Sequence, residues 1–149
     1  ANCMVHHLFR STSAFFLDLG IAYYFLKTTG AVPEQVKGLL AENYVYLCLR
    51  ERMQKRREIA GNTPWFALYQ KTKGELDFYV RSLMDYKNYG IEVKSTDAIA
   101  KTAKRLLEDG KINYLYLLKG DTKGGTSSDG KVYTIPLYLA DRMNFDLGI

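Results

Sequence analysis

Alternating hydrophobic and polar residues predict five strands in this chain. WFALYQKT (65–72) and ELDFYVRS (75–82), separated by Lys73-Gly74, predict a β-hairpin. YGIEVKS (89–95), INYLYLLK (112–119) and VYTIPLYL (132–139) predict three more strands, the last with Pro136 at a strand end or a sheet edge. The Gly- and Ser-rich stretch 120–131 is too polar to pack and predicts a mobile loop.

Longer apolar stretches predict helices around these strands. GIAYYFLK (20–27) predicts a helix that follows a short buried strand, SAFFLDLG (13–20). A turn leads into a long helix that begins near Pro33 and runs to about Arg56. Thr96 or Asp97 can cap a helix that ends at Gly110 and whose apolar residues share one face: Ile99, Ala103, Leu106 and Leu107. A last short helix is predicted at 139–145. This order of elements predicts one mixed α/β domain.

Composition and charge add only broad limits. The chain has 149 residues, 47% of them hydrophobic and 25% charged, which suits one globular domain. A net charge of +5 mildly favours polyanionic partners. Cys3 and Cys48 form neither a disulfide framework nor a metal motif, so we expect reduced thiols and a cytoplasmic location. The apolar runs are too short for a membrane span, and the start ANCMVHHLF predicts a fragment of a longer protein.

Charged residues interrupt the apolar alternation of two predicted strands. Alternation places Leu76, Phe78 and Val80 on one face of the sheet and Glu75, Asp77 and Tyr79 on the other. If this strand pairs with YGIEVKS, Asp77, Glu92 and Lys94 project from the same side. Of five acid-x-Lys triplets in the chain, only Glu92/Lys94 lies inside an apolar strand. Two converging carboxylates beside a lysine can hold a hard divalent cation.

The long helix contributes a third acid. From Gly38 to Leu49 its only polar side chains are Glu42 and Asn43, which predicts a helix buried on most sides. A carboxylate buried without a partner costs several kcal/mol. Glu42 should therefore have a cation, a hydrogen-bond donor or a raised pKa, and a metal shared with Asp77 and Glu92 would satisfy it.

These residues resemble the PD-(D/E)XK nuclease superfamily. The resemblance covers roughly 36–138 and rests on Glu42, Asp77 and Glu92-Val93-Lys94 in that order of elements. Five separated motifs resemble, more closely, the uncharacterised C-terminal domain of prokaryotic predicted AAA-type ATPases: FFLDLGIAYYFL, GLLAENYVYLCLRER, ELDFYV, IEVKS and TIPLYLA. The implied fold is a restriction-endonuclease-like core, with residues 1–30 as an opening segment and 31–149 as the nuclease-like domain.

The resemblance also implies functional roles. Asp77 and Glu92, with the Val93 carbonyl, match metal-binding positions for Mg²⁺ or Mn²⁺, and Glu42 matches the helix acid. Lys94 matches the lysine that orients or activates the attacking water. The segment before Asp77 is Glu75-Leu76, without the Pro of the superfamily pattern. An ATPase module precedes this domain in the family, and no phosphate-binding loop occurs here, so ATP would bind only in that missing module.

Two functional hypotheses follow from this resemblance. The first is Mg²⁺-dependent hydrolysis of DNA, with Glu42, Asp77 and Glu92 at the metal and Lys94 at the water. The second is a catalytically inactive module that regulates or binds its ATPase neighbour, with Glu92–Lys94 or Asp77–Lys94 as a structural ion pair. Lys101, Lys104 and Arg105 form a basic stripe that is either solvent surface or a weak DNA contact. A basic cluster at the end of the long helix could bind phosphates, but it is more typical of solvated cations favoured by the helix dipole: Arg50, Arg52, Lys55, Arg56 and Arg57.

Overall fold

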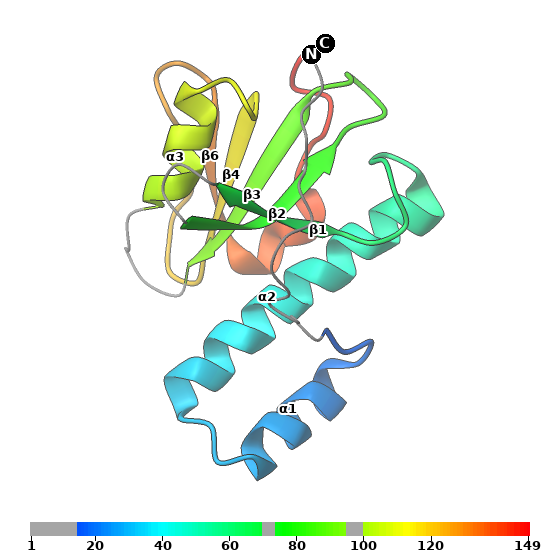
Figure 1. The fold of residues 1–149 in the computed structure, drawn as a ribbon, viewed down its shortest axis with the longest axis vertical. Helices are drawn as coiled ribbons and strands as arrows, with labels where there is room; N and C mark the ends of the chain where they lie inside the picture. Colours follow the sequence, from blue (N-terminus) through cyan, green and yellow to red (C-terminus); the bar gives the residue numbers. More distant parts are fainter. Residues whose placement is uncertain (1–14, 70–73, 95–99) are drawn as a thin grey trace.

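A mixed sheet of six strands organises the computed structural model, which describes residues 15–69, 74–94 and 100–149 (Figure 1). The strands lie in the order β1-β2-β3-β4-β6-β5. Five strands have five to eight residues: β1 (Trp65–Tyr69), β2 (Gly74–Arg81), β3 (Asn88–Lys94), β4 (Tyr114–Lys119) and β6 (Val132–Pro136). The edge strand β5 (Gly125–Thr126) has only two. β1, β2 and β3 are antiparallel, β3, β4 and β6 are parallel, and β5 is antiparallel to β6.

Helices cover both faces of this sheet. α2 (Pro33–Glu51) continues into the π-helix η1 (Arg52–Arg56) and lies on one face together with the 3-10 helix η2 (Leu137–Arg142), whereas α3 (Lys101–Glu108) lies on the other (Figure 1). The larger core, on the α2 side, contains Val45, Leu49, Phe78, Ile91 and Leu118. The smaller core, on the α3 side, contains Leu76, Ala103, Leu106, Ile112 and Leu115. β3 is buried at every residue from Tyr89 to Val93, as expected for a strand covered on both faces.

α1 (Leu19–Thr28) and the first half of α2 form an arm that extends away from the sheet (Figure 1). The Asp18 side chain caps α1 by accepting a hydrogen bond from the Ile21 amide at 2.8 Å. Buried Asn43 on α2 holds the segment before α1: it accepts from the Phe16 amide at 2.7 Å and donates to the Phe16 carbonyl at 3.0 Å. Phe15 stacks on Tyr46 with ring centroids 4.3 Å apart.

The structure confirms the mixed α/β class and the existence of the five predicted strands, with Pro136 at the end of β6. The strand predicted at 132–139 is shorter than expected, because residues 137–139 belong to the 3-10 helix η2. The hairpin turn at 70–73 and the proposed helix caps Thr96 and Asp97 lie outside the described residues. α3 begins at Lys101 and ends, as expected, before Gly110, whose φ of 66° suits glycine.

Three predicted elements were wrong. Residues 15–18 are not a strand but a loop that leads into α1, and the first two residues of that prediction lie outside the described range. The stretch 120–131 does not run unpaired, because Gly125–Thr126 forms β5 against β6. α2 is not buried on most sides: Leu39 is 47% exposed, because the first half of the helix extends past the sheet.

Within the described ranges, no helix combines the length and the apolar character that a membrane span requires.

Candidate functional site

Side chains replace backbone pairing where β2 and β3 separate. The antiparallel pairing of these strands runs from Arg81↔Asn88 to Phe78↔Ile91. Beyond that pair, the Val93 amide donates to Oδ2 of Asp77 at 2.7 Å, and the Asp77 amide makes a longer contact of 3.5 Å with Oε2 of Glu92. The two acids therefore occupy the gap between the strands and satisfy backbone amides that the ladder no longer pairs.

A β-bulge in β2 gives Asp77 this position. Trp65 pairs with Tyr79 and Ala67 with Leu76, so two steps along β1 oppose three steps along β2. Bulges of this kind redirect side chains and are common beside active sites. The bulge also corrects the predicted alternation: Leu76 packs in the core on the α3 side, whereas Phe78 and Val80 pack in the core on the α2 side.

Glu92 and Lys94 form a close ion pair on β3. Lys94 Nζ lies 2.5 Å from Oε1 of Glu92, and the two side chains are 27% and 5% exposed, respectively. Their neighbours Ile91 and Val93 face the α2 side, so alternation directs Glu92 and Lys94 toward the α3 side. The carboxylate is thus buried, while the ammonium reaches solvent at the end of the strand.

The electrostatics of this cluster favour a neutral Asp77 and a charged Lys94. Burial, followed by repulsion from Glu92, raises the pKa of Asp77 to about 7, although the Val93 amide and Lys94 oppose the change. Burial acts to lower the pKa of Lys94, but the hydrogen bond and charge of Glu92 and the charges of Asp77 and Glu42 outweigh it and raise this pKa. At neutral pH, Lys94 is therefore an ammonium and a poor general base.

Glu42 approaches the cluster from α2. Burial raises the pKa of Glu42, Lys94 lowers it, and the charges of Glu75 and Glu92 raise it further. Of the three predicted alternatives for Glu42 (a cation, a hydrogen-bond donor or a raised pKa), the raised pKa is the one that its burial supports. Because Glu42 interacts electrostatically with Lys94, Glu92 and Asp77, it lies near the cluster. In the described part of the chain, no three His, Cys, Asp or Glu side chains are grouped to hold a metal ion.

Asp77 and Glu92 nevertheless suit a hard cation such as Mg²⁺ or Mn²⁺. Mg²⁺ is usually held by one or two carboxylates, with water and substrate phosphates completing its coordination. Repulsion between the two buried acids is the charge imbalance that a divalent cation would relieve. A ligand role for Glu42 stays a prediction. The same holds for the Val93 carbonyl, whereas the Val93 amide donates to Asp77.

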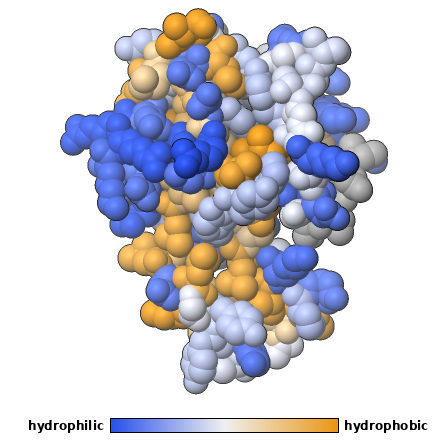
Figure 2. All heavy atoms as spheres, turned by 180° about the vertical axis from the view of Figure 1, so that it is seen from behind, coloured by the Kyte–Doolittle hydropathy of each residue, from blue (hydrophilic) through white to orange (hydrophobic). Residues whose placement is uncertain are grey.

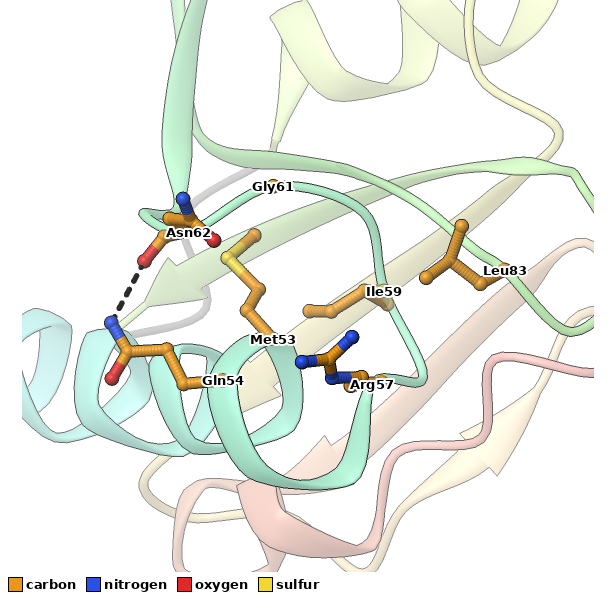
Figure 3. Close-up of a pocket in the computed structure, with 7 residues that line it drawn as sticks. All are labelled: Met53, Gln54, Arg57, Ile59, Gly61, Asn62 and Leu83. Atoms are coloured by element: carbon orange, nitrogen blue, oxygen red, sulfur yellow. Dashed lines mark hydrogen bonds between the residues drawn. The ribbon is translucent and has the colours of Figure 1, made fainter.

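Two surface cavities lie away from these acids. The larger, of about 430 Å³, opens beside the end of α2 (Figure 3) and is lined by Met53, Gln54, Arg57, Ile59, Gly61, Asn62 and Leu83. Gln54 closes one side by donating to the Asn62 carbonyl at 3.1 Å. The second is lined by charges of both signs, including Arg52, Arg56, Glu58 and Asp141. Neither cavity includes a predicted site residue.

The basic residues separate into two groups. Lys101, Lys104 and Arg105 on α3 are exposed, as both interpretations of this stripe require. The expectation that the cluster at the end of α2 is solvated was wrong for Arg52, which is 5% exposed. Its Nη1 lies 2.7 Å from Oε2 of Glu58, its Nη2 donates to the Asp141 carbonyl, and its guanidinium lies over the Phe145 ring.

Sequence reasoning missed the structural roles of Asn43 and Arg52. Asn43 had a signal, as one of only two polar side chains in the apolar part of α2. For Arg52 the nearby acid Glu58 was a weak signal, but its burial depends on Asp141, which lies 89 residues away along the chain.

A comparison of the chain with protein-family models, curated proteins and solved structures finds no match.

Proposed function

We propose that this chain is a nuclease-like domain that uses Asp77, Glu92 and Lys94 to hydrolyse DNA phosphodiester bonds with Mg²⁺ or Mn²⁺. The observation that supports this best is the gap between β2 and β3, where two acids and a lysine meet although the surrounding sheet is apolar. The mixed sheet with helices on both faces is compatible with the restriction-endonuclease-like core that the resemblance implies.

Each residue has a distinct role in this proposal. Asp77 and Glu92 would hold the metal, which when bound polarises the scissile phosphate and activates water. Lys94, kept charged by Glu92, places an ammonium beside the phosphate and stabilises the negative charge that develops in the transition state. The exposed basic stripe Lys101, Lys104 and Arg105 would contact DNA phosphates.

Calorimetric titration of Mg²⁺ and Mn²⁺ tests the metal site. We expect the intact chain to bind metal and Asp77→Ala to lose binding, whereas Asp121→Ala, which removes an exposed acid from a loop, should bind normally. No heat of binding at ~10 mM metal would contradict a metal site formed by this chain alone.

Cleavage of plasmid DNA tests the chemistry. The expected result is metal-dependent nicking that a chelator stops, that Lys94→Ala lowers by about 100-fold or more, and that Lys123→Ala on an exposed loop leaves unchanged. Metal binding without cleavage would exclude independent nuclease activity.

A second candidate function is that of an inactive nuclease-like module that regulates a neighbouring AAA-type ATPase. The closed 2.5 Å pair of Lys94 and Glu92 favours it, because such a pair can serve the fold alone. Under this hypothesis ATP binds only in the neighbouring module. Glu92→Ala and Lys94→Ala would then leave partner binding intact wherever the variants fold.

A further inference from the structure

Lys119 ends β4 directly beside the acids and the lysine of the proposed site. β3 and β4 are parallel neighbours, and their register pairs Glu92 with Leu117 and Lys94 with Lys119. Paired residues of adjacent parallel strands point to the same face of a sheet, and the strands lie about 4.8 Å apart. The ends of β3 and β4 therefore carry two lysines side by side.

The two cores show to which face the Lys119 side chain points. Leu115 belongs to the smaller core and Leu117 packs against it, whereas Tyr116 and Leu118 belong to the larger core on the α2 side. Alternation then directs Lys119 toward the α3 side, the side to which Glu92 and Lys94 also project. Lys119 is half-buried, as expected for a lysine whose stem lies along apolar surface and whose ammonium reaches water.

α3 begins at the same edge of the sheet. Gly74 at the start of β2 has no room for a Cβ, because Thr102 of α3 lies where that atom would be. β2 is antiparallel to β3, so the start of β2 and the end of β3 share one edge. The exposed Lys101 directly precedes Thr102. Lysines from three elements thus surround the edge that holds the two acids: Lys94, Lys101 and Lys119.

The charges at this edge suit a second phosphate group. Lys94 Nζ lies 2.5 Å from Oε1 of Glu92, so that pair has no net charge. Lys119 adds a positive charge one strand further from Asp77. Like charges on adjacent strands repel each other. A phosphate between the two ammonium groups would offset this repulsion through charge-assisted hydrogen bonds.

The arm offers a polyanion no competing surface. Figure 2 shows hydrophobic residues gathered over the lower part of the molecule, where Figure 1 places α1. The only charged residue of α1 is Lys27, which lies over the Tyr23 ring at 5.8 Å. A nucleic acid that reaches the acids is therefore held by the sheet edge and α3.

We propose that Lys119 binds the phosphate next to the scissile one, so that the substrate is a polynucleotide rather than an isolated phosphodiester. This role rests on the proposed function, because a metal at Asp77 and Glu92 holds the scissile phosphate one strand away from Lys119. Lys119 acts in binding, whereas bond cleavage stays with the metal and Lys94.

Fluorescence anisotropy of a short DNA duplex tests this role, with Ca²⁺ in place of Mg²⁺ and a series of salt concentrations. We expect Lys119→Ala to weaken binding by about tenfold. It should also lower the slope of log K against log salt by about 0.9, the change for one lost phosphate contact. Lys111→Ala is the matched control, because it removes the same charge from an exposed residue before the other end of β4. It should bind like the intact chain.

Hydrolysis of two substrates separates this role from the proposed function. Bis(p-nitrophenyl) phosphate is a phosphodiester without a neighbouring phosphate. Lys119→Ala should therefore cleave it like the intact chain but should have a higher KM for DNA. If the intact chain cleaves neither substrate, the nuclease function is wrong, whereas the anisotropy result still decides whether Lys119 binds DNA.

Equal salt slopes for Lys119→Ala and Lys111→Ala would overturn the role of Lys119. An intact chain that binds no duplex at low salt and ~100 µM protein would overturn it as well. So would an equal loss of activity on both substrates, because Lys119 would then serve the chemistry or the fold. Lys119→Gln, which keeps most of the stem, replaces Lys119→Ala if far-UV circular dichroism shows that the alanine variant does not fold.

Discussion

Asp77 illustrates how one side chain can serve both the fold and a proposed chemistry. Its carboxylate accepts the Val93 amide at 2.7 Å and lies beside a second buried acid, Glu92. The hydrogen bond stabilises the sheet, whereas the neighbouring charge destabilises the ionised form of Asp77. A change of pH can distinguish these two effects, because the repulsion acts only on the ionised form of Asp77.

Asp77→Asn should stabilise the metal-free protein at pH 8. The pKa of Asp77 in the folded state, about 7, is above the ordinary value of 3.8. Its contribution to stability is therefore greatest below pH 3.8 and is lost as pH rises to about 7. Asn keeps an acceptor for the Val93 amide but cannot ionise.

We expect the free energy of unfolding of Asp77→Asn to exceed that of the intact chain by about 1–3 kcal/mol at pH 8. The two should be nearly equal at pH 4. Urea unfolding in chelator at both pH values measures this difference, and a variant less stable at pH 8 would contradict the assignment.

Arg52→Leu should destabilise the protein more than Arg56→Leu, although both arginines contact Asp141. The Arg52 side chain is 6% exposed, and its loss leaves Glu58 and the Asp141 carbonyl without their donor. We expect a loss of about 2–3 kcal/mol. Arg56 is largely solvated, so its substitution should have a much smaller effect in the same thermal and urea unfolding experiments. Equal effects would show that burial of Arg52 contributes nothing.

At the scale of elements, the close approach of β3 to the smaller core depends on a glycine. A Cβ on Gly90 would lie 2.6 Å from Ile112 Cδ1 and 3.3 Å from Leu76 Cδ2. Gly38 in α2 has nothing within 4 Å of the same position.

Gly90→Ala and Gly38→Ala should therefore change stability in opposite directions. We expect the first to lower the free energy of unfolding by about 1–2 kcal/mol through overpacking. The second should raise it by about 0.5–1 kcal/mol, because alanine favours a helix interior. Chemical unfolding of the two variants against the intact chain gives the sign of each change. Stabilisation by Gly90→Ala would mean that the core has more space than the structure shows.

Sequence periodicity predicted most of these elements but not the details that form the site. Alternation in ELDFYV was visible, yet the bulge was not, because an extra residue in β2 depends on how β1 pairs with it. The apolar run 13–20 resembled a strand, but Asp18 caps a helix within it, so local capping prevailed over the apolar pattern. The closeness of Asp77 and Glu92 was predictable from strand pairing. That no three acids among the described residues group as metal ligands was not predictable, because it depends on how α2 packs on the sheet.

At the scale of the whole molecule, hydrogen bonds from the turn between β2 and β3 hold the C-terminal segment to the sheet. Asp85 Oδ2 accepts from the Tyr89 hydroxyl at 2.5 Å and from the Gly148 amide at 3.0 Å, and the Ser82 hydroxyl donates to the Phe145 carbonyl. The Tyr89 hydroxyl accepts in turn from the Leu147 amide at 3.0 Å. Residues more than 55 apart in the sequence are thus joined beside the beginning of β3.

Asp85→Asn should weaken this connection at neutral pH but not in acid. Burial acts to raise the pKa of Asp85, but hydrogen bonds from Tyr89, the Lys87 amide and the Gly148 amide outweigh it and lower the pKa. Its stabilisation is therefore present above pH 3.8 and is lost as pH falls through the lower folded-state value.

We expect Asp85→Asn to cost about 1–2 kcal/mol at pH 7 and the two unfolding curves to converge near pH 3. Asp121→Asn on an exposed loop should match the intact chain at pH 7. A cost for Asp85→Asn that stays constant down to pH 3 would contradict the role of its charge. Asp77→Asn is expected to change the free energy of unfolding in the opposite direction, so the two variants together test the direction of both pKa shifts.

The gap between β2 and β3 also has a consequence for the evolution of this domain. Because Asp77 supplies the acceptor that the Val93 amide needs, selection would keep an acid or amide at this position even in a descendant that lost the proposed nuclease activity. Lys94 has no such role toward the backbone amides, so the residue at position 94 would be the first to change. Among diverged copies of this domain, loss of the lysine with retention of the aspartate would identify lineages that lost the proposed catalytic activity and kept the fold.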